Sequence, residues 1–196
     1  MRKSASNTTK LQAIHTLADE ALMQRLSSGE LACAAALFDR YQKWIYNFFL
    51  RLEASNQELS QDLTQSVFER MIRYRTSYRT GASFKTWIFQ IARNVRADHY
   101  KKNRMLVDDF AALEQEPSTE RSVEHQLTAK EQKEQLYKAL DALPEAQREV
   151  IVLTRFQQLK YSEVGKLLAC TEGAVKVKVH RAIKALKDQF FKLESR

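Results

Sequence analysis

Aromatic and cationic side chains alternate along residues 74–101, and this combination can hold a nucleic-acid strand whose bases are unpaired. Bases stack on aromatic rings at about 1–3 kcal/mol per base, while Arg and Lys side chains neutralise phosphates. Before a loop centred on Gly81, the residues in question are Tyr74, Arg75, Tyr78 and Arg79. After the loop, a helix is expected to expose Lys85, Phe89, Arg93, Arg96 and Tyr100, with Lys101 at the edge. Tyr74 and Trp87 suit a buried core at least as well as a nucleic-acid contact.

A second group of cations lies in a segment that reads as two helices joined by a turn at residues 168–171, YSEVGKLLACTEGAVKVKVHRAIKAL. Thr171 is expected to cap the second helix, and Gly165 is small where the two helices could approach closely. One stripe of the second helix is expected to be buried, namely Val175, Val179, Ala182 and Leu186. The opposite face would carry Lys176, Val177, Lys178, His180, Arg181 and Lys184.

Val177 is therefore expected to be an exposed apolar side chain surrounded by cations. In a major groove it could pack on a thymine methyl group while the cations contact phosphates and guanine edges. The alternative is a basic surface helix with one exposed Val. The two-helix pattern favours recognition of duplex DNA.

A third surface has a different character. In the expected helix DLTQSVFERMIRY, a polar stripe of Asp62, Gln65, Glu69 and Arg73 lies beside Phe68 and Ile72, which are expected to be exposed at its flank. An apolar edge next to a polar stripe suits a helical protein partner, although a buried flank has the same pattern.

The net charge of +8 is concentrated in two blocks. Residues 65–104 carry 10 basic and 2 acidic side chains, and residues 155–196 carry 10 and 4. Between them, residues 105–134 carry 3 basic and 8 acidic side chains. A solvated surface usually mixes the signs, so two basic blocks indicate two contacts with a polyanion.

The elements that must position these side chains are long helices. Four Gly and two Pro in 196 residues are too few for a fold that needs tight turns at short intervals. We predict an all-α protein with two small helical domains joined by an acidic linker. The expected ranges are a flexible tail at 1–16, a helical bundle at 17–104, the linker at 105–134 and the helix-turn-helix domain at 135–196.

Other classes of protein are excluded by what the sequence lacks. It has no apolar run near the ~18 residues of a membrane span and no signal-peptide core at its start. Cys33 and Cys170 lie far apart, in neither a disulfide framework nor a zinc spacing. The four His residues occur singly, so we predict no metal site, no cofactor and no catalytic centre.

The segments described above resemble, in this order, the extracytoplasmic-function (ECF) class of bacterial sigma-70 factors, the small initiation subunits of RNA polymerase. DLTQSVFERM is similar to their core-polymerase-binding helix in region 2. SFKTWIFQIARNVRADHYKK is similar to their segment that melts and recognises the −10 element. The segment that begins at LPEAQREV is similar to region 4, which binds the −35 element.

The resemblance implies roles for particular positions. Asp62, Gln65 and Phe68, with Glu69 beside them, fall where the family docks on the polymerase. Asn94 falls where members capture a flipped −10 base, and residues 78–84 would form the loop of that pocket. Flipping a base costs a few kcal/mol, so the pocket must be rigid. The acidic linker corresponds to the segment that crosses the polymerase interior.

The resemblance also implies partners: core RNA polymerase, promoter DNA and an anti-sigma factor, with no small-molecule substrate and a cytoplasmic location. It implies no catalytic role, because the chemistry belongs to the polymerase. The alternative is a stand-alone helix-turn-helix regulator that binds duplex operator DNA as a dimer. That alternative leaves the aromatic residues of the first basic block unexplained.

Overall fold

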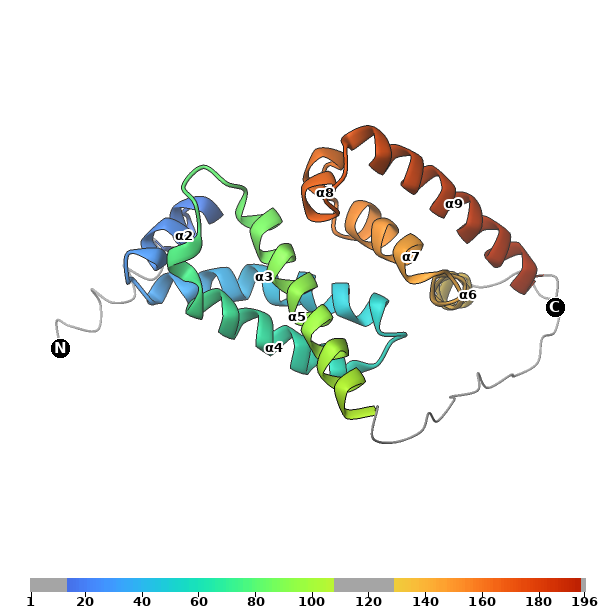
Figure 1. Cartoon of the computed structure of the whole chain (residues 1–196), viewed down its shortest axis with the longest axis horizontal. Helices are drawn as coiled ribbons and strands as arrows, with labels where there is room; N and C mark the ends of the chain where they lie inside the picture. Colours follow the sequence, from blue (N-terminus) through green and yellow to red (C-terminus); the bar gives the residue numbers. More distant parts are fainter. Residues whose placement is uncertain (1–13, 108–128, 195–196) are drawn as a thin grey trace. The chain divides into compact units, whose positions relative to one another are not determined.

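The computed structural model describes residues 14–107 and 129–194 (Figure 1). Every regular element in these two ranges is helical, which confirms the predicted all-α class. The chain divides into two compact units, Met1–Val95 and Arg96–Arg196, and the division falls inside one long helix. Each unit is described by itself.

The first unit is built around α3 (Ala32–Leu52), which packs against α2 (Asp19–Ser27) and α4 (Gln57–Arg73). A short 3-10 turn, η1 (Arg75–Ser77), follows α4, and α5 (Phe84–Val107) begins after an irregular loop. Several aromatic rings of the core meet edge to face, as Phe48 and Phe89 do at 5.4 Å between ring centres. The other large core side chains include Leu37, Ile45, Phe49, Leu63, Val67, Phe84 and Ile88.

Local chemistry separates the helices of this unit. Gly29 follows α2 with φ of +104°, a conformation that a side chain would disfavour. Asn56 caps α4, because its side-chain oxygen accepts a hydrogen bond from the Leu59 amide at 3.0 Å. These two positions help to fix where α2 ends and where α4 begins.

In the second unit α9 (Glu172–Glu194) packs against three shorter helices, α6 (Ala129–Asp141), α7 (Glu145–Ile151) and α8 (Tyr161–Leu167). A single π-helical turn, η2 (Val152–Phe156), extends α7. The apolar core that these helices share includes Leu140, Leu143, Val150, Ile151, Leu153, Val164, Leu167, Val175 and Val179.

Arg148 holds the turn between α6 and α7. Its Nη2 donates hydrogen bonds to the carbonyl oxygens of Asp141 at 2.6 Å and Leu143 at 3.2 Å. Burial raises the pKa of the Asp141 carboxyl above its ordinary value, and the Arg148 charge, 3.8 Å away, partly offsets this shift. The turn therefore has a fixed geometry that orients α7 toward the core.

The start of the predicted helical bundle needs a change, and the division between the two units falls at Val95 rather than at the predicted residue 104. Ile14 is buried, and the carbonyl oxygen of His15 accepts a hydrogen bond from Arg40 at 2.7 Å, so the predicted tail at 1–16 is too long by at least three residues. The predicted linker at 105–134 lies mostly outside the described residues. Helices occupy both of its ends, since α5 reaches Val107 and α6 begins at Ala129.

Candidate nucleic-acid interface

α8 and α9 form the predicted two-helix unit. A Cβ atom on Gly165 of α8 would lie 2.7 Å from the carbonyl oxygen of Cys170, so only glycine permits this approach of the turn to the helix. The Thr171 hydroxyl accepts a hydrogen bond from the Ala174 amide at 3.2 Å. The expected close approach and the expected N-cap are both confirmed.

One face of α9 is buried and the opposite face is open. Val175, Val179 and Ala182 are buried, and Val177 on the other side is 49% exposed. Its cationic and imidazole neighbours are all exposed: Lys176, Lys178, His180, Arg181 and Lys184. Lys176 pairs with Glu172 one turn earlier at 3.5 Å, an exposed i,i+4 pair of small energy. This face has the charge and apolar content that a major groove accepts.

The loop before α5 is more closed than the sequence pattern suggests. Tyr78 is buried, its ring meets Trp87 edge to face at 5.4 Å, and its hydroxyl donates a hydrogen bond to the carbonyl oxygen of Ala82. Burial raises the pKa of the Tyr78 phenol, and the nearby Glu20 and Asp19 charges raise it further. Tyr78, which the sequence predicts as a nucleic-acid contact, is therefore buried, and its side chain closes the loop from inside.

The prediction for Phe89 is also wrong. Its side chain is fully buried against Phe48 of α3. Phe84, Ile88, Ile91 and Val95 lie along one narrow stripe of α5, and Phe89 and Ala92 beside that stripe are buried as well. A helix with such a wide apolar face lies deep in a bundle. Phe89 therefore belongs to the core.

The remaining predicted residues of the first basic block reach solvent. Arg79, Asn94, Tyr100 and Lys101 are exposed, whereas Arg75, Lys85, Arg93 and Arg96 are half-buried. Gln90 Nε2 donates to Asn94 Oδ1 at 2.9 Å, which leaves the Asn94 amide nitrogen as its outward donor. The Arg96 guanidinium stacks over the Tyr100 ring at 4.9 Å. Tyr74, which the sequence left open, is exposed.

Trp44 is a surface aromatic that sequence reasoning missed. It lies on α3, outside the basic block, and its ring is 4.8 Å from the Lys85 ammonium. Lys85 connects it to the predicted nucleic-acid face. The only signal in the sequence is a Trp at a polar position of the α3 pattern, and no local pattern relates it to α5.

The predicted protein-binding surface on α4 is partly as expected. Asp62, Gln65 and Glu69 are exposed, and Gln65 Nε2 donates to Glu69 Oε1 at 2.8 Å. Phe68 is buried rather than exposed, because Phe38 of α3 covers it edge to face at 4.8 Å. Phe38 is itself 40% exposed. The apolar edge of this surface therefore consists of Phe38 and Ile72.

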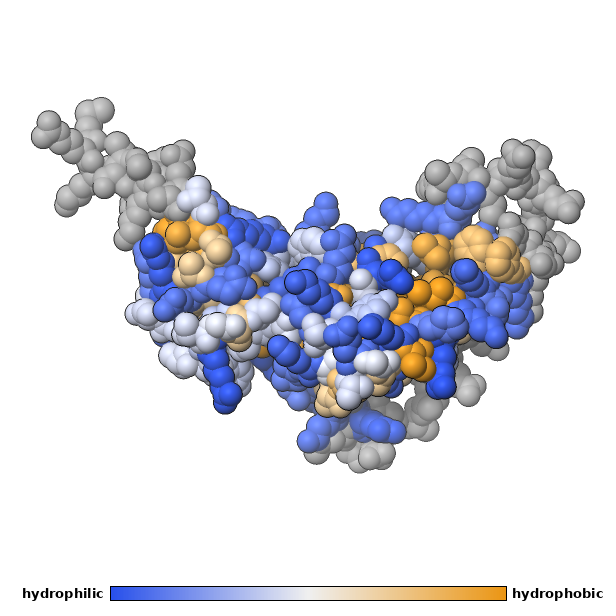
Figure 2. All heavy atoms as spheres, turned by 90° about the horizontal axis from the view of Figure 1, so that it is seen from above, coloured by the Kyte–Doolittle hydropathy of each residue, from blue (hydrophilic) through white to orange (hydrophobic). Residues whose placement is uncertain are grey.

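Figure 2 shows apolar patches separated by hydrophilic residues. Large aromatic or aliphatic side chains that reach the surface include Leu31, Trp44 and Tyr74 in the first unit and Phe191 in the second. Among the described helices, none is long and apolar enough to cross a membrane. The same residues contain no group of three or more His, Cys, Asp or Glu side chains that could hold a metal ion.

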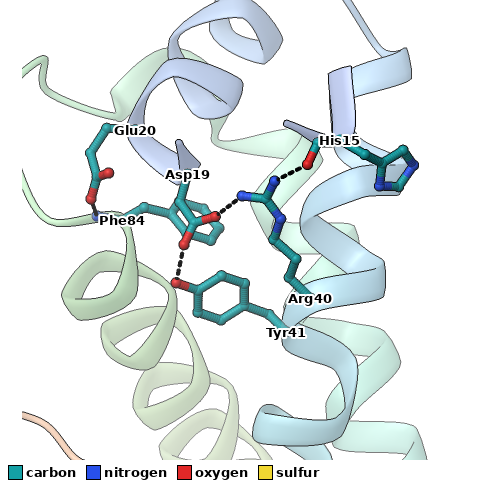
Figure 3. Close-up of polar contacts among 6 residues, drawn as sticks. All are labelled: His15, Asp19, Glu20, Arg40, Tyr41 and Phe84. Atoms are coloured by element: carbon teal, nitrogen blue, oxygen red, sulfur yellow. Dashed lines mark hydrogen bonds and ion pairs between the residues drawn. The ribbon is translucent and has the colours of Figure 1, made fainter. Parts of the chain in front are cut away.

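Polar contacts at the start of α2 connect it to α3 (Figure 3). The Asp19 carboxylate accepts hydrogen bonds from the Arg40 guanidinium and, at 2.5 Å, from the Tyr41 hydroxyl. Burial raises the pKa of the Tyr41 phenol well above its ordinary value, and the hydrogen bond to Asp19 and its charge add to the shift. Tyr41 is therefore a protonated donor at physiological pH.

Comparison with known protein families gives two matches. The family model described as Sigma-70 region 2 matches residues 37–105, and the one described as Sigma-70, region 4 matches residues 133–186. These ranges contain the α4 surface, the first basic block and the two-helix unit.

Curated relatives match along most of the chain. The ECF RNA polymerase sigma factor SigX of Bacillus subtilis is 30% identical over 157 residues, which is 77% of this chain and 80% of that protein. The RNA polymerase sigma factor CarQ of Myxococcus xanthus is 29% identical over 172 residues, covering 88% and 97%.

Among solved structures, the fold is similar to that of the sigma factor RpoE from Bartonella quintana, crystallised in complex with the anti-sigma factor NepR. The TM-score is 0.64 and the identity is 22%, over 78% of this chain and 92% of the other. At this identity the similarity supports the fold.

Proposed function

The chain belongs to the ECF class of sigma-70 factors, the transcription initiation factors that direct RNA polymerase to promoters, and from this premise we propose which of its surfaces carries each step. The observation that carries the assignment is the presence, in one chain, of a basic helix-turn-helix and a separate basic face with aromatic residues.

The α9 face contacts the −35 element. This role is supported by the exposed Val177 among five cationic or imidazole side chains on a helix whose other face is buried. Cations on such a face neutralise phosphates, and an apolar side chain can meet a thymine methyl group.

The loop at residues 78–83 and the open face of α5 act on the −10 element. Asn94, with its amide oriented by Gln90, receives a flipped base, while Arg79, Lys85, Arg93 and Lys101 neutralise nearby phosphates. The exposed Tyr100, stacked on Arg96, and Trp44, stacked on Lys85, offer rings to unpaired bases. Phe89 and Tyr78 contribute to this surface from the core.

Asn94 can be tested by substitution. Asn94→Ala is expected to slow promoter opening and leave the affinity for core polymerase unchanged, since the side chain is exposed and outside the α4 surface. Asn103→Ala, also an exposed amide on α5, is the matched control. Loss of polymerase binding in the Asn94 variant would contradict the assignment.

The α4 surface docks on core RNA polymerase. Asp62, Gln65 and Glu69 provide its polar stripe, with Phe38 and Ile72 as the apolar edge and Phe68 packed beneath Phe38. The predicted acidic linker lies mostly outside the described residues, so its route through the polymerase stays a prediction.

Regulation by a protein partner and a cytoplasmic location are also part of the proposed function. Because a structural relative was crystallised with an anti-sigma factor, we propose that a partner of this kind holds the present chain inactive by competing with core polymerase. The chain would act in the cytoplasm, where bacterial RNA polymerase and the chromosome are. It would supply no catalytic group and bind no cofactor or small-molecule substrate.

Co-elution of the purified chain with bacterial core RNA polymerase on a sizing column tests the whole assignment. Stoichiometric co-elution is the expected result. A folded chain that elutes alone at modest salt, and that binds duplex operator DNA as a dimer, would overturn it and identify the stand-alone regulator.

A further inference from the structure

Two adjacent carboxylates in the first turn of α2 reach different helices (Figure 3). Asp19 accepts hydrogen bonds from Arg40 and Tyr41 of α3. Glu20 reaches the start of α5, where its Oε1 accepts a hydrogen bond from the backbone amide of Phe84 at 3.1 Å. α2 is thus fixed to α3 by one residue and to α5 by the next.

The Glu20 contact satisfies one of the amides that the first turn of a helix leaves without an intrahelical partner. Ser83, directly before α5, provides a local cap, since its hydroxyl accepts a hydrogen bond from the Thr86 amide at 3.2 Å. Glu20 acts as a second cap, supplied from 64 residues away. A carboxylate is also favoured at the positive end of the helix dipole.

The segment that ends at this cap is the loop assigned above to the −10 element. Two hydrogen bonds close its interior. The Tyr78 hydroxyl donates to the carbonyl oxygen of Ala82, and the Ala82 amide donates to the carbonyl oxygen of Arg79 at 3.1 Å. Arg79 and Gly81 remain exposed at its tip. The side of the loop that joins α5 is held by Phe84, whose ring is buried edge to face against Tyr41 at 4.9 Å.

We propose that Glu20 is a positioning residue for promoter opening: by capping α5 from α2, it fixes the loop at residues 78–83 in the geometry that receives the unpaired −10 strand. This inference rests on the proposed function of that loop. Glu20 itself contacts no base in this scheme, and it acts through the Phe84 amide.

If Glu20 acted only through its negative charge, its removal would have the opposite effect on promoter opening. A carboxylate beside a cationic nucleic-acid face repels phosphates, so its removal should strengthen promoter binding if electrostatics were its only effect. If Glu20 positions the loop, its removal should instead slow opening, although the chain becomes more positive.

The experiment uses the full chain with core polymerase on a promoter that the wild-type holoenzyme opens. Glu20→Ala removes both charge and acceptor, whereas Glu20→Gln keeps an oxygen that can accept from the Phe84 amide. Glu30→Ala, which removes a carboxylate elsewhere in the first unit, is the matched control. The readouts are polymerase affinity, the rate of open-complex formation and hydrogen exchange of the Phe84 amide.

We expect Glu20→Ala to slow opening about three- to tenfold, the range that loss of one helix cap implies, with faster exchange at Phe84 and unchanged polymerase affinity. Glu20→Gln should open within about twofold of the wild type, because a neutral oxygen still caps the amide. Glu30→Ala should match the wild type in all three measurements.

Opening by Glu20→Ala at or above the wild-type rate would overturn the proposal, and so would a Gln variant as slow as the Ala variant. If Glu20→Ala does not fold, the opening rate of Glu20→Gln and the hydrogen exchange of its Phe84 amide still test whether Glu20 positions the loop. Failure of the proposed function would look different, because the wild-type chain would then neither bind polymerase nor open the promoter.

Discussion

The two nucleic-acid faces of the molecule are built in different ways. The α9 face is a row of side chains on one helix, held by a local cap at Thr171 and a close approach at Gly165. The first unit assembles its face from a loop, one side of α5 and Trp44 of α3, and fixes it through contacts that span up to 64 residues. Substitutions on the exposed face of α9 should therefore change affinity alone, whereas many in the first unit should act through the fold.

The largest effect is expected from Phe89→Ala. Removing a fully buried aromatic ring from the first unit should lower the free energy of unfolding by about 3–5 kcal/mol, measured by denaturant unfolding. Val177→Ala on the exposed face of α9 is the counterpart and should leave stability unchanged. A Phe89→Ala variant that is stable yet impaired in promoter opening would remove the contrast between the two faces.

Gly165→Ala tests whether the second unit has a comparable weak point. The added Cβ would meet the Cys170 carbonyl oxygen at 2.7 Å, and overpacking against the backbone typically costs about 1–3 kcal/mol. Unfolding of the second unit and −35 binding by the holoenzyme should both be affected. Gly173→Ala is the control, because the nearest atom to its added Cβ is 4.0 Å away.

The double substitution Lys176→Ala and Arg181→Ala should leave stability unchanged and weaken −35 binding. Two fewer neutralised phosphates should reduce the salt slope of binding by about 1.8, measured with the holoenzyme at several salt concentrations. Lys133→Ala with Lys138→Ala on α6 removes the same charge from another surface and should leave the slope unaltered. Equal slopes in the two double variants would show that α9 is not the recognition face.

The smallest effect is expected from Tyr41→Phe, which removes one hydrogen bond to the Asp19 carboxylate and should cost the first unit about 1.5 kcal/mol at neutral pH. Because burial raises the pKa of Tyr41 above its ordinary value of 10.0, the unfolded chain ionises this phenol first. The stabilisation that the protonated Tyr41 phenol gives the folded chain is thus complete below pH 10 and is lost as the pH rises above 10.

Above pH 10 the wild type should lose about 1.4 kcal/mol per pH unit relative to the Phe variant. The two stability curves should cross near pH 11 in unfolding experiments. Parallel curves would mean that Tyr41 ionises as easily in the folded chain as in the unfolded one.

The same contrast explains which features could be predicted from the sequence. The exposure of Val177, the buried stripe on α9, the cap at Thr171 and the all-α class follow from helical periodicity and local capping. The family was recognisable from three segments in order. Each of these depends on residues that are close in sequence.

The errors share a different cause. Phe89 and Phe68 are expected on exposed faces and Tyr78 at a nucleic-acid contact, but Phe48, Phe38 and Trp87 cover them from other turns or helices. Trp44 and Glu20 were missed because each meets α5 from an element far earlier in the chain. Periodicity gives the face of a helix, whereas the width of its buried stripe depends on its tertiary neighbours.

The separation between Glu20 and Phe84 also sets an order of events during synthesis. Glu20 leaves the ribosome 64 residues before its partner, an interval of about 3–13 s at usual elongation rates. α2 and α3 have time to meet, through Asp19 and Tyr41, before α5 exists. The second cap of α5 is thus among the last contacts of the first unit to form, and a nascent chain acquires its promoter loop only when the surrounding bundle is complete.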